Sequence, residues 1–152
     1  MLRKFSLRGL WICTLLVLLI AAGQGLSGHW VLFYLLWPGG SGVGQAFMLA
    51  MVKLGIYHIA AGFTVGILSI LILIFAFLAK SNFYVRILAV VSFIITFVAV
   101  LGGYWYVTSG FTDRWALGQM ADAFVGVFAG YFIQLIFMLV KPGSLRKRAT
   151  AD

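Results

Sequence analysis

Four long apolar segments decide what this chain can fold into. They lie at about 9–27, 57–79, 85–107 and 119–140, and each is long enough to cross a bilayer core, which takes roughly 20 mostly apolar residues. The chain of 152 residues is 64% hydrophobic and 9% charged, outside the range of a soluble globular domain. The sequence therefore predicts an all-α integral membrane protein in which residues 1–152 form a single four-helix bundle.

The positions of the basic residues predict the orientation of this bundle. Nine of the eleven Lys and Arg residues precede the first segment, lie between the second and third, or follow the fourth. Only Lys53 and Arg114 lie on the other side. Basic residues favour the cytoplasmic side, so we expect both termini there and a multi-pass protein of the cell (plasma) membrane. The net charge of +8 thus reflects topology and attraction to anionic lipid headgroups, and it predicts the lipid bilayer rather than nucleic acid as a partner.

The side opposite the termini carries most of the aromatic and turn-forming residues outside the spans. The stretch HWVLFYLLW at residues 29–37 predicts a short segment lying on or dipping into the outer interface, because tryptophan and tyrosine settle at headgroup level. A glycine-rich connection follows at 38–44. We expect the loops 28–46 and 108–118 to face outward, so a functional site would lie near the outer leaflet.

A short internal repeat places an ionisable residue above two glycines in the second and fourth segments. His58 is followed by Gly62 and Gly66, and Asp122 is followed by Gly126 and the glycine at position 130, each at steps of four residues. Residues four apart share one face of a helix. Such glycines let helix backbones approach closely. Alternatively, the glycines below His58 leave room for a flat cofactor.

His58 is the strongest candidate for a site residue. It lies about 22 residues from Lys80 along the second segment, or roughly 33 Å at 1.5 Å per residue, close to the outer boundary of the hydrocarbon core. An ionisable residue at that depth suggests a functional site. His58 could bind haem or a metal, or it could be a hydrogen-bonded structural histidine.

Three further polar residues are candidates near the same height. His29 follows the first segment and could be a ligand or an interfacial anchor beside a tryptophan. Asp122 is the acidic residue placed to enter the bundle, and Gln119 lies one turn before it and could form hydrogen bonds. A set of His29, His58 and Asp122 would suit copper or zinc. Paired carboxylates, nucleophile triads and phosphate loops are absent from the sequence.

The second and third segments resemble one four-helix half of the haem A synthase family. The matching stretches are HIAAGFTVGILSILILIFAFLA, NFYVR and FVAVLGGYWYVTSG, and the resemblance covers roughly residues 54 to 137. In that family a histidine opens the second helix, and a Gly-Gly pair and a Thr-Gly turn end the third. The resemblance implies that His58 is an axial haem ligand and that the following residues match the end of the third helix: Gly102, Gly103, Thr108 and Gly110.

Two positions differ from the family's pattern. Gly55 stands where the family has the acid that its oxidation chemistry needs. Gln119, with Met120 beside it, stands where the family has its second axial histidine. The sixth ligand to a haem would then be Met120 or His29, and any enzyme activity would be that of a haem A synthase-like oxidoreductase.

Two functions follow from these residues. The first is a small haem-binding protein of a respiratory chain, which transfers electrons or modifies a b-type or related haem near the outer leaflet. In this function His58 is the axial ligand, and Gly62 and Gly126 leave the slot for the porphyrin. The alternative is a non-catalytic accessory subunit, without a cofactor, that packs against other membrane subunits of an oxidase-like redox complex.

Overall fold

The computed structural model consists of four α-helices and describes residues 2–36, 45–109 and 114–140. Side chains are described for 3–26, 55–106, 108–109, 115–116 and 118–140. The helices are α1 (Leu2–Leu36), α2 (Gln45–Leu78), α3 (Phe83–Thr108) and α4 (Arg114–Val140). Each contains a candidate membrane span, long and apolar enough on average to cross a bilayer: Arg3–Leu26, Gly55–Leu78, Phe83–Tyr106 and Gly118–Val140. The protein is therefore a four-helix, multi-pass membrane bundle, as the sequence predicts.

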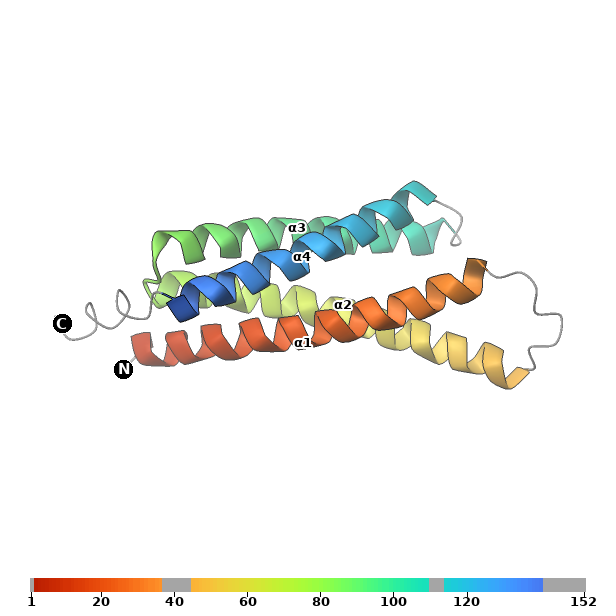
Figure 1. Ribbon diagram of the computed structural model, residues 1–152, viewed down its shortest axis with the longest axis horizontal. Helices are drawn as coiled ribbons and strands as arrows, with labels where there is room; N and C mark the ends of the chain where they lie inside the picture. Colours follow the sequence, from red (N-terminus) through yellow and green to blue (C-terminus); the bar gives the residue numbers. More distant parts are fainter. Residues whose placement is uncertain (1, 37–44, 110–113, 141–152) are drawn as a thin grey trace.

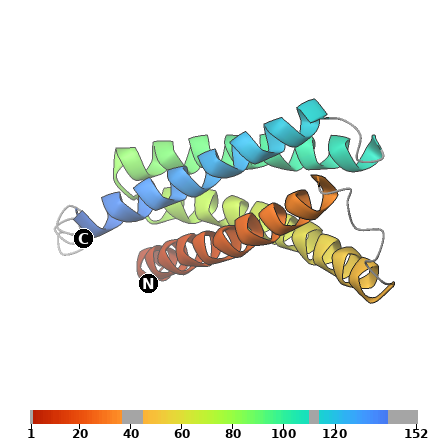
Figure 2. The ribbon, with the colours of Figure 1, turned by 45° about the vertical axis from the view of Figure 1, so that its right-hand side comes forward.

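The helices run antiparallel, each beside the next in the chain (Figure 1). The α2–α3 hairpin, the start of α1 and the end of α4 lie together at one end, called here the hairpin end. The other end is called the far end. The α3–α4 and α1–α2 pairs pack most extensively, and α1 closes the ring against α4 with the smallest interface. The helices spread apart toward the far end in both views (Figure 2).

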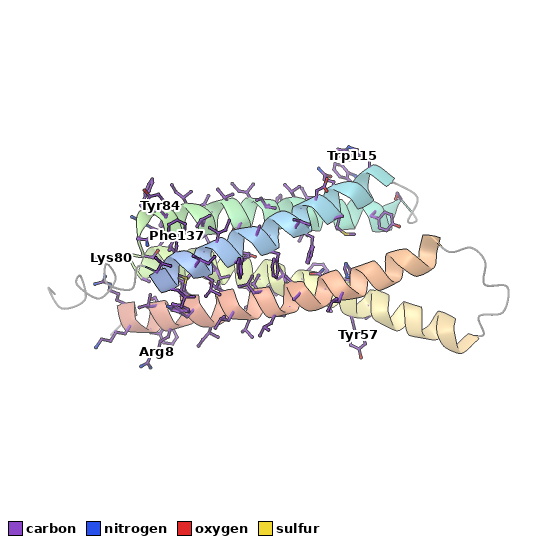
Figure 3. All side chains as sticks on the ribbon, in the orientation of Figure 1. Arg8, Tyr57, Lys80, Tyr84, Trp115 and Phe137 are labelled. Carbon is purple, nitrogen blue, oxygen red and sulfur yellow. The ribbon has the colours of Figure 1, made fainter. Side chains whose placement is uncertain are left out.

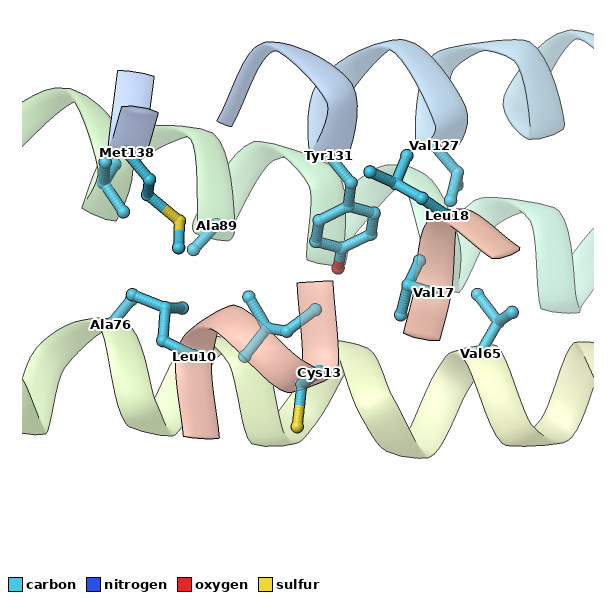
Figure 4. Close-up of a cluster of buried hydrophobic side chains, with 12 residues drawn as sticks. Leu10, Cys13, Val17, Leu18, Val65, Ala76, Ala89, Val127, Tyr131 and Met138 are labelled. Atoms are coloured by element: carbon cyan, nitrogen blue, oxygen red, sulfur yellow. The ribbon is translucent and has the colours of Figure 1, made fainter. Parts of the chain in front are cut away.

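The buried core fills the half of the bundle nearer the hairpin. On α2 the buried side chains follow a helical stripe from Val65 to Ala76, whereas no side chain from Gly55 to Thr64 is buried. The core side chains from all four helices interdigitate around Tyr131 of α4 (Figure 4). Among the described residues, the stretch from Gly55 to Thr64 is thus the part of α2 that the rest of the chain covers least.

The tight turn between α2 and α3 is fixed by hydrogen bonds at both helix ends. Lys80 adopts a left-handed conformation (φ 49°), and the Ser81 amide donates to the Ala76 carbonyl while the Lys80 amide donates to that of Phe77. These bonds form a Schellman motif, which satisfies the last carbonyls of a helix. Asn82 then caps α3 by accepting a hydrogen bond from the Val85 amide at 2.8 Å.

A side chain of α1 also binds this turn. The Arg3 Nε donates to the Ala79 carbonyl oxygen at 3.3 Å, which satisfies another group at the end of α2. Arg8 and Lys80 lie at the hairpin end, whereas Trp115 lies at the far end (Figure 3). Along the spans, large apolar side chains such as Leu19, Phe63, Ile67 and Phe97 are exposed on the outside of the bundle. In a membrane protein this surface faces lipid chains.

The helices extend further than hydropathy alone indicates. Residues 29–36 continue α1 rather than forming a separate interfacial segment, so that prediction was wrong. The stretch after Gly28 contains no glycine or proline until Pro38, and α1 ends at Leu36, close before that proline. Likewise, residues 45–46 belong to α2 and 114–118 to α4, which shortens both expected loops. The predicted glycine-rich connection at 38–44 lies outside the described residues.

We expect the hairpin end to be cytoplasmic, because nine of the eleven basic residues belong to segments that meet there or flank it. A reporter inserted at Gly40 should then be active only outside the cell, and one fused to the C-terminus only in the cytoplasm. Reporter fusions at these two sites, with expression of each fusion measured as the control, check the orientation. Finding both reporters on the same side would contradict a four-span topology.

Candidate functional site

His58 and Gly62 lie on the inward side of α2, in its far half. They precede the buried residues Val65 and Ser69, respectively, by seven residues, which is nearly two full helical turns. Both are half-buried, in contrast to the fully covered stripe below them. His58 therefore extends the inward face of α2 into the part of the bundle where the helices spread apart.

Gln24 of α1, which the sequence reasoning missed, meets this face. Its side-chain amide donates a hydrogen bond to the backbone carbonyl of His58, with 3.3 Å between Nε2 and the oxygen. The same nitrogen lies 3.2 Å from the point that a β-carbon on Gly62 would occupy. The absence of a side chain at Gly62 thus gives the Gln24 amide access to α2. A lone glutamine near the end of an apolar span was the available signal.

The predicted site residues on α4 face elsewhere. Met120 packs on α3, with its sulfur 3.5 Å from the β-carbon position of Gly103. Gln119 is half-buried. Asp122, which was expected to enter the bundle, is instead exposed on the outside of α4. Gln119, Met120 and Asp122 therefore do not form one inward-facing cluster with His58.

The two glycine motifs, alike in sequence, have different surroundings. The β-carbon position of Gly126 lies 3.0 Å from the Ile95 side chain, and that of Gly130 falls against the Ser92 hydroxyl. Both glycines thus allow close packing of α4 on α3. On α2, by contrast, no described residue lies within 4 Å of the β-carbon position of Gly66.

These surroundings decide how well a haem or metal would fit. Ile95 covers Gly126, so no porphyrin could lie against that glycine. Among the described side chains, no three His, Cys, Asp or Glu residues are grouped to hold a metal ion. The side chain of His29 lies outside the described residues, so the metal site of His29, His58 and Asp122 stays a prediction. Asp122, the one carboxylate in that set, is exposed. The α4 half of the predicted haem site does not fit, while the α2 half keeps open space.

Comparisons of the chain with protein-family models, with curated proteins and with solved structures find no match. The fold and the surroundings of the candidate residues therefore carry the functional argument.

A second group of polar residues, which the sequence reasoning also missed, lies in the middle of the bundle. Every helix contributes to it, and every member is at least 97% buried. The signal in the sequence was the presence of one or two polar residues within each otherwise apolar span. This central polar cluster consists of Thr14, Ser69, Ser92, Thr96, Tyr131 and Gln134.

Proposed function

We propose that this protein is a non-catalytic accessory subunit that packs, through the far half of α2, against a transmembrane helix of another protein in the plasma membrane. The observation that carries this proposal is the open space at the glycines of α2. Among the described residues, no atom lies within 4 Å of the β-carbon positions of Gly55 and Gly66, and no side chain between Gly55 and Thr64 is buried.

The geometry of α2 suits a helix as the occupant. Gly55 and Gly66 lie on one face, because eleven residues correspond to about three helical turns, and Gly62 lies at the edge of this face, where it meets Gln24 of α1. Small residues on one face let two membrane helices bring their backbones close together, which gives van der Waals contact that lipid chains do not match. The face lies within an apolar span, so the partner segment is an apolar transmembrane helix.

The resemblance to the haem A synthase family indicates where to look for this partner. It points to an oxidase-like redox complex of a respiratory chain. In such a complex the partner would hold the cofactors, and this chain would cover a surface of that partner near the outer leaflet.

Haem binding remains a second candidate, favoured by the inward position of His58. Its helix face continues to Gly66, where a flat group could lie without meeting a side chain. A b-type haem would then be held on α2 by His58, with His29 as the remaining predicted second ligand, because Met120 packs on α3. His58 and its sixth ligand would set the redox potential of the iron.

The substitution Gly66→Leu tests the proposal. The bundle should fold as before, because the new side chain begins in open space, whereas the partner should no longer co-purify because its helix cannot approach. The matched control is Gly23→Leu, at a glycine of α1 that also has nothing within 4 Å. The measurement is the amount of partner recovered with each affinity-tagged variant from native membranes in a mild detergent, with elution volume as the check on folding.

Two results would contradict an accessory role. One is recovery of the same partner with Gly66→Leu and with the unchanged chain. The other is a haem absorption band in the purified protein that disappears in His58→Ala, which would support the second candidate. A colourless protein that loses its partner in Gly66→Leu, but keeps it in Gly23→Leu, is the expected outcome.

A further inference from the structure

The central polar cluster has more hydrogen-bond acceptors than available donors. The hydroxyl groups of Thr14, Ser69 and Thr96 lie 2.7 or 2.8 Å from carbonyl oxygens of their own helices, four residues earlier. A hydroxyl has one proton to donate, so each of these groups then faces the cluster mainly with lone pairs. Only weaker contacts link the helices: Ser69 lies 3.3 Å from the Thr96 hydroxyl, and the Gln134 amide lies 3.3 Å from the Thr14 hydroxyl.

Two fully buried groups on α4 are left without a partner among the described residues. The Tyr131 hydroxyl points from α4 into the bundle (Figure 4) and lies close enough to the hydroxyls of Ser69 and Thr96 to interact with them, but no described group forms a short, well-aligned hydrogen bond with it. The Gln134 side-chain oxygen has no donor. Exchanging the oxygen and nitrogen of this amide would still leave one end unpaired, because only the end facing Thr14 has a neighbour.

Tyr131 and Gln134 are neighbours on one helix face. They are three residues apart, which places their side chains one turn from each other on the inward side of α4. Buried polar groups are nearly always hydrogen-bonded to protein or to ordered water. Inside a bilayer core, lipid offers no hydrogen bonds, so any missing partner must come from within the bundle.

We propose that the central polar cluster binds water, with at least one molecule held between the Tyr131 hydroxyl and the Gln134 amide. A water molecule accepts a hydrogen bond from the tyrosine and donates to the glutamine oxygen and to a lone pair of Ser69 or Thr96. These are the three partners that a buried water typically has. The cluster contains no charged side chain, so a neutral ligand that both donates and accepts suits it better than an ion. The water would join α4 to α2 or α3, where the hydroxyl protons of Ser69 and Thr96 are directed to their own backbones.

The test measures magnetisation transfer from water to the side chains of the full chain in lipid bilayers by solid-state NMR. The chain has six tyrosines, and the Tyr131 ring signal is identified as the tyrosine signal that is absent from the spectrum of Tyr131→Phe. If that variant does not fold, the signal is assigned through its sequential correlation with Gly130. We expect transfer to Tyr131 to be several-fold faster than to Ile72, a fully buried apolar side chain of α2. Transfer as slow as that to Ile72 would overturn the proposal and indicate direct bonds to Ser69 and Thr96.

A pair of substitutions identifies the residue that holds the water. Gln134→Leu removes both ends of the amide, so transfer to Tyr131 should fall to the level of Ile72. The matched control is Met138→Leu, at a position of α4 that is equally buried, and it should leave the transfer unchanged. Unchanged transfer in a folded Gln134→Leu protein would overturn the assignment of Gln134 as a water partner.

Discussion

Tyr131→Ala is expected to destabilise the bundle by about 3–5 kcal/mol, the range typical of truncating a buried aromatic side chain to alanine. Tyr131 is the largest of the side chains that the structure buries completely, and it lies at the centre of the core (Figure 4). Its removal would leave a cavity that helices held by neighbours on both sides cannot close. The measurement is the free energy of unfolding in mixed micelles with increasing SDS.

The control for this substitution is the next residue along the helix. Phe132 is a similar ring, but it is 48% exposed on the outside of α4, where lipid or detergent chains can replace it. We therefore expect Phe132→Ala to change the free energy of unfolding by much less than Tyr131→Ala. Equal losses for the two variants would contradict the orientation of α4 in the bundle.

The four spans could be predicted from sequence because their cause is local. An apolar run of bilayer length is sufficient to form a membrane helix, and the predicted span at 119–140 agrees closely with Gly118–Val140. The start of α1 was missed for the same reason. Hydropathy detects the part of a helix that lies in lipid, whereas Leu2–Arg8, with its three basic residues, is helical without being apolar.

The contacts within the candidate site could not be predicted, because they depend on how each helix is rotated about its axis. In a soluble protein the apolar face reveals that rotation, but these spans are apolar on all sides. The motifs beginning at His58 and Asp122 therefore looked equivalent. Packing turns Gly126 toward α3 and leaves Gly66 open, and it places Asp122 on the outside.

Polar side chains indicate the inward face of each span better than the glycine motifs do. Where a helix is surrounded by lipid, a polar residue in mid-span favours the interior, because there it finds hydrogen-bond partners. Ser69, Thr96 and Gln134 are all buried, and each marks the inward side of its helix. The depth of His58 was inferred from its distance to Lys80, but its contact with Gln24 depends on the pairing of α1 with α2.

Gly130→Ala provides a second large effect, this time from overpacking. A β-carbon at this position would fall against the Ser92 hydroxyl and lie 3.3 Å from the Ser92 β-carbon. Rotating the hydroxyl away would relieve only the first of these contacts, so α3 and α4 must move apart along part of the most extensive interface in the bundle. Overpacking of this kind costs about 1–3 kcal/mol, which we expect to appear as a lower free energy of unfolding.

Two further variants show whether the loss in Gly130→Ala arises at this contact. Adding Ser92→Ala removes the hydroxyl oxygen, so the double variant should recover part of the lost stability, and the two substitutions should be non-additive. Gly66→Ala makes the same chemical change in a membrane helix where nothing lies within 4 Å, so it should leave the stability unchanged or slightly higher. A strictly additive double variant, or an equal loss in Gly66→Ala, would mean that glycine itself, rather than its contact with Ser92, is what α4 requires. The expected pattern instead assigns Gly126 and Gly130 to the α3–α4 interface and leaves the open face of α2 as the surface available to another helix.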